Sequence, residues 1–471
     1  MTSATVPTSS SSVADAAIAP LPAGGDQADR FDWQEAWYPV FYVKDLEKTK
    51  LATFTLLERD LVIWWDEQAS CWRAFDDQCP HRLAPLSQGR IAEDGLLECP
   101  YHGWAFSGSG DCQRIPQQPE GGTAETSRRA CVASLPTTVE QGMLFVYAGD
   151  PTRADRVPVP IVEPLEESPE KWVCMDMFRD LPYDALTLLE NVLDSSHVPF
   201  THHRSVSKRE YASPVELEVL DSDRQGFRGF WQDGPRKGTL GSQNTRFIAP
   251  SLMWHDLTAK QLGRTMTVVY ATPIRKGECR VFARFPFQFA SKLPEFFIKI
   301  APQWYSHLGQ NGVLEDDQIF LHHQERYLEA RGGGAEFSRA FYLPTKADRF
   351  VFELRQWVET YQADPFPGQT LPPALPDEVL LDRYHSHTKH CKSCRVALSR
   401  IQAIRTTCAI AAIALWASFP VLWAAGINLP LWGAIALSGT VLGLGTAWWR
   451  LGRLVRQFYE GRTVPPRNHA K

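Results

Sequence analysis

Cys79-Pro80-His81-Arg82 and Cys99-Pro100-Tyr101-His102-Gly103-Trp104 decide the fold of the first third of this sequence. Each stretch pairs one cysteine with one histidine, and seventeen residues separate the two pairs. Strand-type runs at Leu61–Trp65 and Leu144–Tyr147, with turn residues at Gly108–Asp111, surround them. We therefore expect both pairs on proline-turned loops between the strands of a small all-β domain.

Two thiolates and two imidazoles can hold a metal centre of two kinds. They suit a zinc ion, and they suit a Rieske [2Fe–2S] cluster, in which two cysteines hold one iron and two histidines hold the other. Two features favour the cluster over zinc. Each pair lies on a proline-turned loop between predicted strands, and the pattern lacks the helix of a zinc finger. The predicted ligands are Cys79, His81, Cys99 and His102. Histidine ligation raises the reduction potential, so that such a cluster accepts electrons from ferredoxin-type donors.

A second group of metal-binding side chains follows a predicted helix at Tyr183–Leu193. Asn191, Asp194 and His197 recur at three-residue steps, and His202 follows after four further residues that include the turn residue Pro199. Two histidines and one carboxylate leave positions open for O2 on a ferrous ion, as in non-haem iron oxygenases. Such a group is also common in ordinary polar clusters. The iron interpretation gains weight because an electron carrier in the same chain needs an acceptor.

The carboxylate of this site has to come from elsewhere in the chain. A predicted helix at 313–330 supplies Asp316 and Asp317, of which we favour Asp317. His203 competes with His202 for the second histidine position, and the four-residue spacing after His197 favours His202.

The composition describes an ordinary globular chain in most of its length. It has 471 residues, 44% hydrophobic and 22% charged, and a net charge of -5, which argues against a nucleic-acid binder. Strand-type runs and helical segments are segregated along the chain, which favours an α+β fold class. The expected divisions are a disordered tail at 1–31, an all-β domain at 32–150, a catalytic iron domain at 165–385, a redox segment at 386–400, two transmembrane helices within 406–449 and a basic tail at 450–471.

Two uncharged runs near the C-terminus, Thr406–Ala425 and Leu431–Trp449, predict a transmembrane helical hairpin. Each run is about long enough to cross a ~30 Å hydrocarbon layer at ~1.5 Å per residue. Arginine and lysine residues flank both outer ends and none lies in the turn, which places both ends on the cytoplasmic side. A buried hairpin of a soluble protein is the alternative interpretation.

A Cys391-x-x-Cys394 pair lies just before the first of these runs. Such a pair can close into a disulfide, and its basic neighbours make the thiols more reactive. A redox switch, a metal site and inert thiols all remain open. The metal site would draw on the nearby histidines His385, His387 and His390.

Both metal motifs, in this order, resemble those of the Rieske non-haem iron oxygenases. The stretches 79–87, 190–203 and 382–394 are similar to the pheophorbide a oxygenase family, which includes chlorophyllide a oxygenase relatives and a Rieske subunit of the plastid inner-envelope translocon. The resemblance covers about residues 33–455. It implies an N-terminal all-β Rieske domain, a helix-grip (START-like) catalytic domain and the membrane pair.

The resemblance also implies roles for individual residues. It makes Asp194 the residue that links cluster and iron across a subunit boundary, since such oxygenases are commonly homotrimers. It makes Cys391 and Cys394 a thioredoxin-responsive switch. The long transit peptide of plant members is not apparent, so we expect a cyanobacterial thylakoid or plasma membrane, or else a plastid membrane with the catalytic domains on the stromal side. The ligand sets that it implies are Cys79, His81, Cys99 and His102 for the cluster, and His197, His202 and a carboxylate for the iron.

The sequence therefore predicts an oxidoreductase: a membrane-anchored, ferredoxin-dependent Rieske monooxygenase that uses O2. By resemblance its substrate is a flat, apolar tetrapyrrole of chlorophyll catabolism, and Asn191 and Asp194 serve turnover. A hydroxylase of another lipid-soluble molecule and a redox-sensing membrane subunit without turnover are the alternatives. A quinol-oxidising Rieske subunit is disfavoured, because such subunits carry an N-terminal anchor and lack the Asn191–His202 motif.

Overall fold

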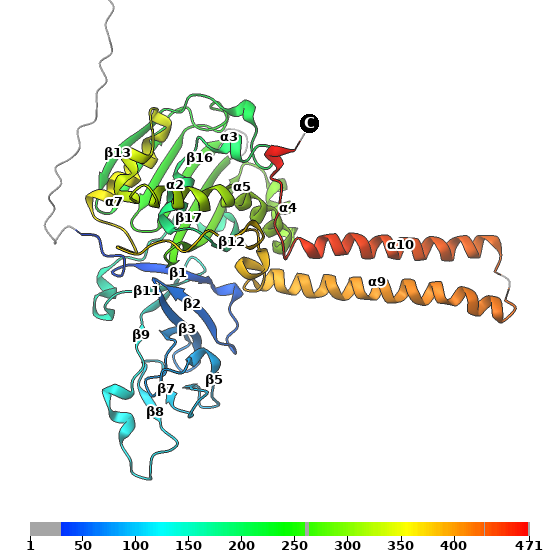
Figure 1. Cartoon of the computed structure of the whole chain (residues 1–471), viewed down its shortest axis with the longest axis horizontal. Helices are drawn as coiled ribbons and strands as arrows, with labels where there is room; N and C mark the ends of the chain where they lie inside the picture. The colour runs from blue at the N-terminus through cyan, green and yellow to red at the C-terminus, as the bar shows by residue number, and fades with distance from the viewer. Residues whose placement is uncertain (1–29, 260–262, 428, 470–471) are drawn as a thin grey trace, which may run out of the picture.

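The computed structural model describes residues 30–259, 263–427 and 429–469. The tail expected at 1–31 therefore lies almost wholly outside the described residues. Figure 1 shows three parts in what remains: a small β region in blue and cyan, a larger sheet with helices in green and yellow, and a long hairpin of two helices in orange and red. The chain is a mixture of helices and strands: the long helices follow the last strand, whereas shorter helices lie on either side of the strand Val173–Leu181.

The small β region contains three antiparallel sheets, and both predicted strand runs lie in it as strands. Their orders are β1-β11-β10, β2-β3-β4-β9 and β5-β6-β7-β8. The strands are β1 (Trp37–Tyr42), β2 (Ala52–Leu56), β3 (Arg59–Asp66), β4 (Cys71–Asp76), β5 (Arg90–Ile91), β6 (Leu97–Glu98), β7 (Ala105–Phe106), β8 (Cys112–Arg114), β9 (Ser134–Leu135), β10 (Thr137–Glu140) and β11 (Met143–Tyr147). The predicted turn at Gly108–Asp111 joins β7 to β8.

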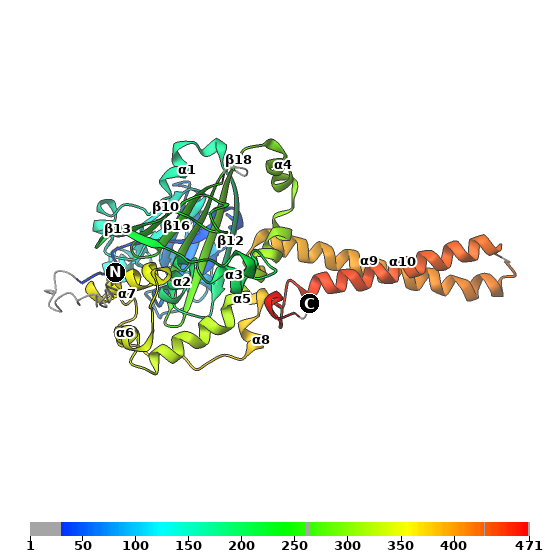
Figure 2. The ribbon, with the colours of Figure 1, turned by 90° about the horizontal axis from the view of Figure 1, so that it is seen from above.

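The larger part is a seven-stranded antiparallel sheet in the order β12-β18-β17-β16-β15-β14-β13. Its strands are β12 (Val173–Leu181), β13 (Leu217–Asp223), β14 (Gly226–Trp231), β15 (Gln243–Ile248), β16 (Leu252–Ala259), β17 (Gly263–Arg275) and β18 (Glu278–Phe289). Helices cover one face of this sheet, and Figure 2 shows α2, α5 and α7 side by side there. The helices before the hairpin are α1 (Glu163–Glu167), α2 (Ala185–Leu193), α3 (Val198–Thr201), α4 (Lys292–Ile300), α5 (Gln303–Glu329), α6 (Phe337–Ala340), α7 (Arg349–Thr360) and α8 (Asp377–Leu380).

The small β region and the large sheet share one apolar core. Phe41 and Phe54 of the former pack in the same cluster as Val281 of the latter. The Arg280 guanidinium lies 5.4 Å from the Phe41 ring centroid and 4.8 Å from that of Phe54, and it pairs with Asp180. The two parts are therefore held together by apolar burial and by a cation seated on aromatic rings.

A buried ion cluster joins α5 to the large sheet and to the segment before the hairpin. Glu315 of α5 lies 2.7 Å from Arg179 of β12 and 2.6 Å from Arg383. All three side chains are at most 3% exposed. Burial alone would raise the pKa of the Glu315 carboxyl, but the two guanidinium groups lower it overall, so it is a carboxylate at neutral pH.

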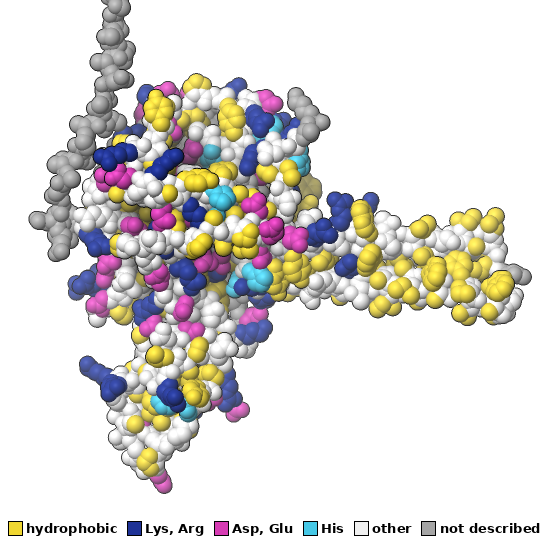
Figure 3. Space-filling model, in the orientation of Figure 1, with side chains coloured by type: hydrophobic (Ala, Val, Ile, Leu, Met, Phe, Trp, Pro, Cys, Tyr) yellow, Lys and Arg dark blue, Asp and Glu magenta, His cyan; other side chains and the backbone are white. Residues whose placement is uncertain are grey.

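The hairpin consists of α9 (Lys392–Ala424) and α10 (Leu431–Arg456), and both predicted apolar runs lie within it. The helix α9 begins well before its apolar run, because its first turns pack against the folded part through Cys394, Ala397 and Leu398. Beyond these turns the large apolar side chains are exposed, as the yellow surface of Figure 3 shows. By length and composition both helices can cross a membrane.

Removing the buried carboxylate tests the role of the ion cluster. We expect Glu315→Gln to lower the free energy of unfolding by about 3–5 kcal/mol, because two buried guanidinium groups lose their counter-charge. Thermal and urea unfolding of the detergent-solubilised protein measure this change. The matched control is Asp221→Asn, which breaks the exposed pair with Arg228 and should leave stability nearly unchanged. Equal stability of the two variants would contradict the assigned role.

Candidate functional site

The two cysteine–histidine stretches form loops of the same shape. The Cys79 amide donates to the Ala84 carbonyl at 2.9 Å, and the Cys99 amide donates to the Trp104 carbonyl at 2.8 Å. In each loop the fourth residue after the cysteine has a positive φ, which is 71° at Gly103 in the second loop. Both thiols are buried as a result, with exposed fractions of 1% and 3%.

The two histidines of these loops lie together. The His81 and His102 ring centroids are 4.6 Å apart, and Trp104 stacks on His81 with an interplanar angle of 3°. His81 is exposed, whereas the Nδ1 atom of His102 is buried and finds no hydrogen-bond partner among the residues described. A buried ring nitrogen without a partner is costly, and a metal ion would satisfy it.

Burial raises the pKa of the Cys79 thiol to about 12. A thiolate there therefore requires a nearby cation. Two buried sulfurs, a pair of adjacent imidazoles and one unsatisfied ring nitrogen fit a [2Fe–2S] cluster with mixed ligation. All four predicted residues are brought to this place.

The second predicted group also comes together, and it joins α3 to α5. His197 precedes α3, His202 ends it, and Asp317 projects from α5. The Asp317 carboxylate lies 3.2 Å from His202 Nε2 and 3.9 Å from His197 Nε2. One ligand atom from each residue lies within 4.8 Å of the others, so the three can share one metal ion.

Hydrogen bonds orient both imidazoles toward Asp317. Asp316 lies 3.3 Å from the Nδ1 atom of His202 and also accepts from the Ser205 hydroxyl at 2.7 Å. The Nδ1 atom of His197 bonds to the Asp194 carbonyl. Both rings therefore direct Nε2 toward the centre, and a hydrogen-bond partner behind the ring is typical of metal-binding histidines. This arrangement supports Asp317 as the ligand and Asp316 as the group that orients His202.

Asn191 and Asp194 flank this group at the C-terminal end of α2. The Asn191 amide donates to Asp317 Oδ1 at 3.4 Å. Burial raises the pKa of the Asp317 carboxyl, although the two neighbouring histidines act in the opposite direction. The Asp194 carboxylate accepts from the Ser196 amide at 2.7 Å and is 28% exposed. His203 lies outside the group, because its ring accepts from the Arg209 amide.

A cavity of about 880 Å3 adjoins the three ligand candidates. Its volume is near the upper end of the roughly 300–1,000 Å3 that small-molecule sites occupy. The walls of the cavity come from the sheet and from loops, and they are mainly apolar; they include Trp231, Leu257, Val269 and Phe285. None of these wall residues was predicted from the sequence. Alternation along the strands indicates which side chains share a face, but not which face encloses a cavity.

His255 is a buried polar member of this wall. Its Nε2 atom donates to the Val192 carbonyl at 2.9 Å, and its Nδ1 atom accepts from the Thr245 hydroxyl at 2.8 Å. Burial lowers the pKa of His255 to about 4, so the ring is neutral at neutral pH. It therefore adds a fixed dipole to the cavity but no charge.

Cys391 and Cys394 lie at the N-terminal end of α9, where both are buried and neither forms a disulfide. Of the three nearby histidines considered above, His387 lies beside the two thiols. The ring of His385 instead bonds to Asp382 at the surface.

Comparisons with known proteins agree with this geometry. Residues 36–136 match the family described as "Rieske [2Fe-2S] domain", and residues 247–335 match "Pheophorbide a oxygenase". The chloroplastic pheophorbide a oxygenase of Arabidopsis thaliana is 37% identical over 81% of this chain and 76% of its own length. Flavonoid 8-hydroxylase 2 of Ocimum basilicum is 35% identical over 80% and 76%.

Two further relatives extend the comparison. Protochlorophyllide-dependent translocon component 52 of Arabidopsis thaliana is 34% identical over 82% of this chain and 77% of its own length. The solved structure of dicamba monooxygenase bound to dicamba covers 70% of this chain and 97% of its own, with a TM-score of 0.56 and 22% identity, which shows a shared fold.

Relatives of this similarity confirm the resemblance noted in the motifs, together with the two cofactors, a Rieske [2Fe–2S] cluster and a mononuclear iron. They also confirm an oxygenase. This chain belongs to the pheophorbide a oxygenase family of Rieske non-haem iron oxygenases.

Proposed function

We propose that this chain is a monooxygenase that inserts one oxygen atom of O2 into a flat, apolar, chlorophyll-derived tetrapyrrole. The observation that carries the proposal is the opening of the His197, His202 and Asp317 group into a large apolar cavity. The names of several relatives refer to tetrapyrroles related to chlorophyll, which supports the substrate class. A reduced ferredoxin or a similar protein supplies the electrons.

The proposed cluster ligands are Cys79, His81, Cys99 and His102, and the proposed iron ligands are His197, His202 and Asp317. When bound, the cluster supplies single electrons, and the ferrous ion supplies positions at which O2 can be activated. The protein's own part is to hold these groups. Asp316 keeps the His202 ring in one orientation, and the apolar walls exclude bulk water from the place where substrate and O2 meet.

The exposed side of the small β region around His81 is the proposed docking place of the electron donor. His81 is exposed at the end of the small β region, so a donor protein can approach the cluster site closely. In Figure 1 the sheet β5–β8 of this region lies at the opposite end of the folded part from α3. We therefore propose a homotrimer in which the partly exposed Asp194 faces the cluster loops of a neighbouring copy and bridges the two sites.

We propose that α9 and α10 span a membrane as a hairpin. Their apolar surfaces are exposed in the structure, and basic residues flank both outer ends. By the positive-inside tendency, this charge pattern favours a catalytic part on the cytoplasmic or stromal side. The curated relatives named above are chloroplastic, which is consistent with a thylakoid or other photosynthetic membrane.

A second function has one observation in its favour. A relative of almost the same similarity is named flavonoid 8-hydroxylase, and a flavonoid is also planar and largely apolar. Hydroxylation of a smaller planar molecule in the same cavity is therefore the alternative.

The assignment of the iron ligands can be tested with two neighbouring variants. We expect Asp317→Ala to lose the mononuclear iron and all turnover while the visible spectrum of the cluster is kept. Asp316→Ala should reduce turnover or iron affinity by about 10–100-fold, because only the support of His202 is lost. Iron analysis and absorbance spectra measure both effects. Complete loss of iron in Asp316→Ala, with iron retained in Asp317→Ala, would reverse the two roles.

The reaction itself can be tested with labelled oxygen. The purified protein is reduced without air, mixed with pheophorbide-type tetrapyrroles or with flavonoids, and then exposed to 18O2. Mass spectrometry should find one labelled oxygen atom in a tetrapyrrole product. Label in the flavonoid alone would favour the second function. Oxygen consumption without any oxygenated product would instead indicate a redox-sensing subunit.

A further inference from the structure

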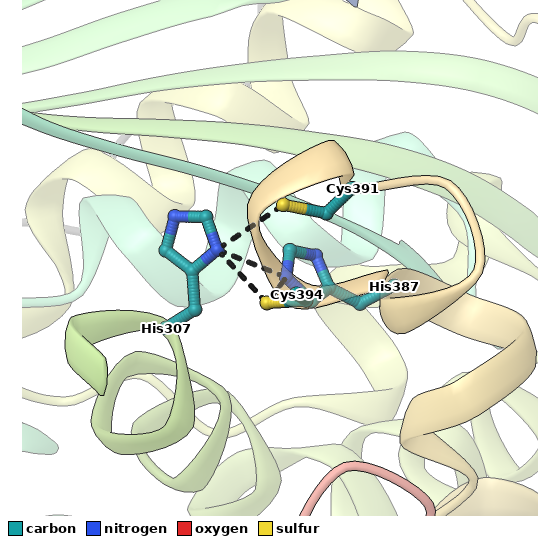
Figure 4. Close-up of side chains that lie close together, drawn as sticks. All are labelled: His307, His387, Cys391 and Cys394. Atoms are coloured by element: carbon teal, nitrogen blue, oxygen red, sulfur yellow. Dashed lines mark hydrogen bonds between the residues drawn. The ribbon is translucent and has the colours of Figure 1, made fainter. Parts of the chain in front are cut away.

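A buried cluster of four side chains lies at the root of the hairpin, away from the sites described above. His307 comes from α5, His387 from the π-helical turn Tyr384–Thr388, and Cys391 and Cys394 from the start of α9. Each side chain is at most 1% exposed. Figure 4 shows the four pointing toward one another, and one donor atom of each lies within 4.8 Å of the others.

The distances inside the cluster are short. The Nδ1 atom of His307 lies 3.5 Å from each of the two sulfurs. The Nε2 atom of His387 lies 3.4 Å from the Cys394 sulfur and 3.1 Å from His307 Nδ1. Two nitrogens and two sulfurs therefore surround a single point.

The other side of each ring is tied to the backbone of β12. The Nε2 atom of His307 donates to the Asp176 carbonyl at 2.9 Å, and the Nδ1 atom of His387 donates to the Phe178 carbonyl at 2.6 Å. A neutral imidazole carries one ring proton, so these bonds leave a lone pair on the nitrogen that faces the cluster. A carbonyl behind each histidine is the usual support of a metal-binding imidazole.

Two lone pairs that face each other at 3.1 Å repel unless a proton or a metal ion lies between them. In the metal-free protein the two thiols can each donate a proton to one ring, which satisfies the rings without removing this repulsion. When a divalent ion binds, both thiol protons are released and all four atoms become ligands. Two thiolates then balance the ion's charge, so that a buried centre of zero net charge results.

We propose that His307, His387, Cys391 and Cys394 bind a structural zinc ion. Two thiolates and two imidazoles are a zinc ligand set, and four protein ligands without an open position are typical of structural sites. The ion would fasten α5, which carries Asp317, to the turn Tyr384–Thr388 and to the start of α9. This inference does not depend on the proposed function, because none of the four residues lines the cavity.

The site also replaces an expectation drawn from the sequence. Among the three open interpretations, the metal site would draw on His385, His387 and His390, whereas the cluster contains His387 together with His307 from a distant helix. A thioredoxin-responsive switch requires that a partner thiol reach the pair, and the exposed fractions of Cys391 and Cys394 are 0% and 1%. The burial and the paired histidines therefore favour a metal over a switch.

Metal analysis of the full-length, detergent-solubilised protein tests the proposal. We expect about one zinc ion per chain, beside the iron of the two cofactors. In the double variant Cys391→Ser/Cys394→Ser the zinc content should fall by about tenfold or more, whereas the iron content and the cluster spectrum should not change. The control is Cys174→Ser, a partly buried cysteine outside all three groups, which should keep its zinc. Zinc that persists in the double variant would overturn the site.

A measurement on the unaltered sequence covers the case in which the double variant does not fold. Protein produced with Co2+ in place of Zn2+ should show the intense visible bands of a tetrahedral ion and a sulfur-to-cobalt band in the ultraviolet. Absence of both bands, together with absence of zinc, would overturn the proposal. Protein that is isolated without zinc and with a Cys391–Cys394 disulfide, which thioredoxin reopens, would do the same and would establish the redox switch instead.

Discussion

The structure depends on the neutralisation of one buried carboxylate. The helix α5 carries many polar side chains into the interior, and such a helix can pack against a sheet only where its charges are balanced. Glu315 receives that balance from Arg179 on β12 and from Arg383 next to the hairpin. These pairs tie the middle of α5 to β12 and to the segment before the hairpin. Asp317 of the proposed iron site and His307 of the thiol cluster lie on either side of Glu315 in the sequence of α5.

Backbone carbonyls orient histidine rings both in the His197, His202 and Asp317 group and in the thiol cluster. Asp194 supplies one to His197, and β12 supplies one each to His307 and His387. A carbonyl belongs to the fold and cannot change its protonation, so it sets the ring orientation before any metal arrives. The two groups thus depend on main-chain geometry, which side-chain motifs do not record.

Much of this architecture could be predicted from local sequence. The spacing of Cys79, His81, Cys99 and His102 is short enough to define one site, and the two long apolar runs identify the hairpin. The choice between Asp316 and Asp317 was harder, because adjacent helical residues differ by about 100° in direction and only packing decides which one faces the histidines. His307 could not be found, since about 80 residues separate it from its partners and no local pattern marks it. The cavity walls come from strands whose enclosed face depends on the tertiary fold.

The unbroken course of α9 has a mechanical consequence. Its 33 residues extend for about 50 Å at ~1.5 Å each, and the first turns are clamped in the protein interior. No loop separates these buried turns from the apolar part, so that α9 connects the folded part to the apolar hairpin as one rigid helix. With α9 and α10 spanning a lipid bilayer, as proposed above, the oxygenase domain can revolve around the bilayer normal but cannot tumble. Its cavity then stays at a constant height above the lipid surface, and its encounters with lipid-dissolved pigment become a search in two dimensions.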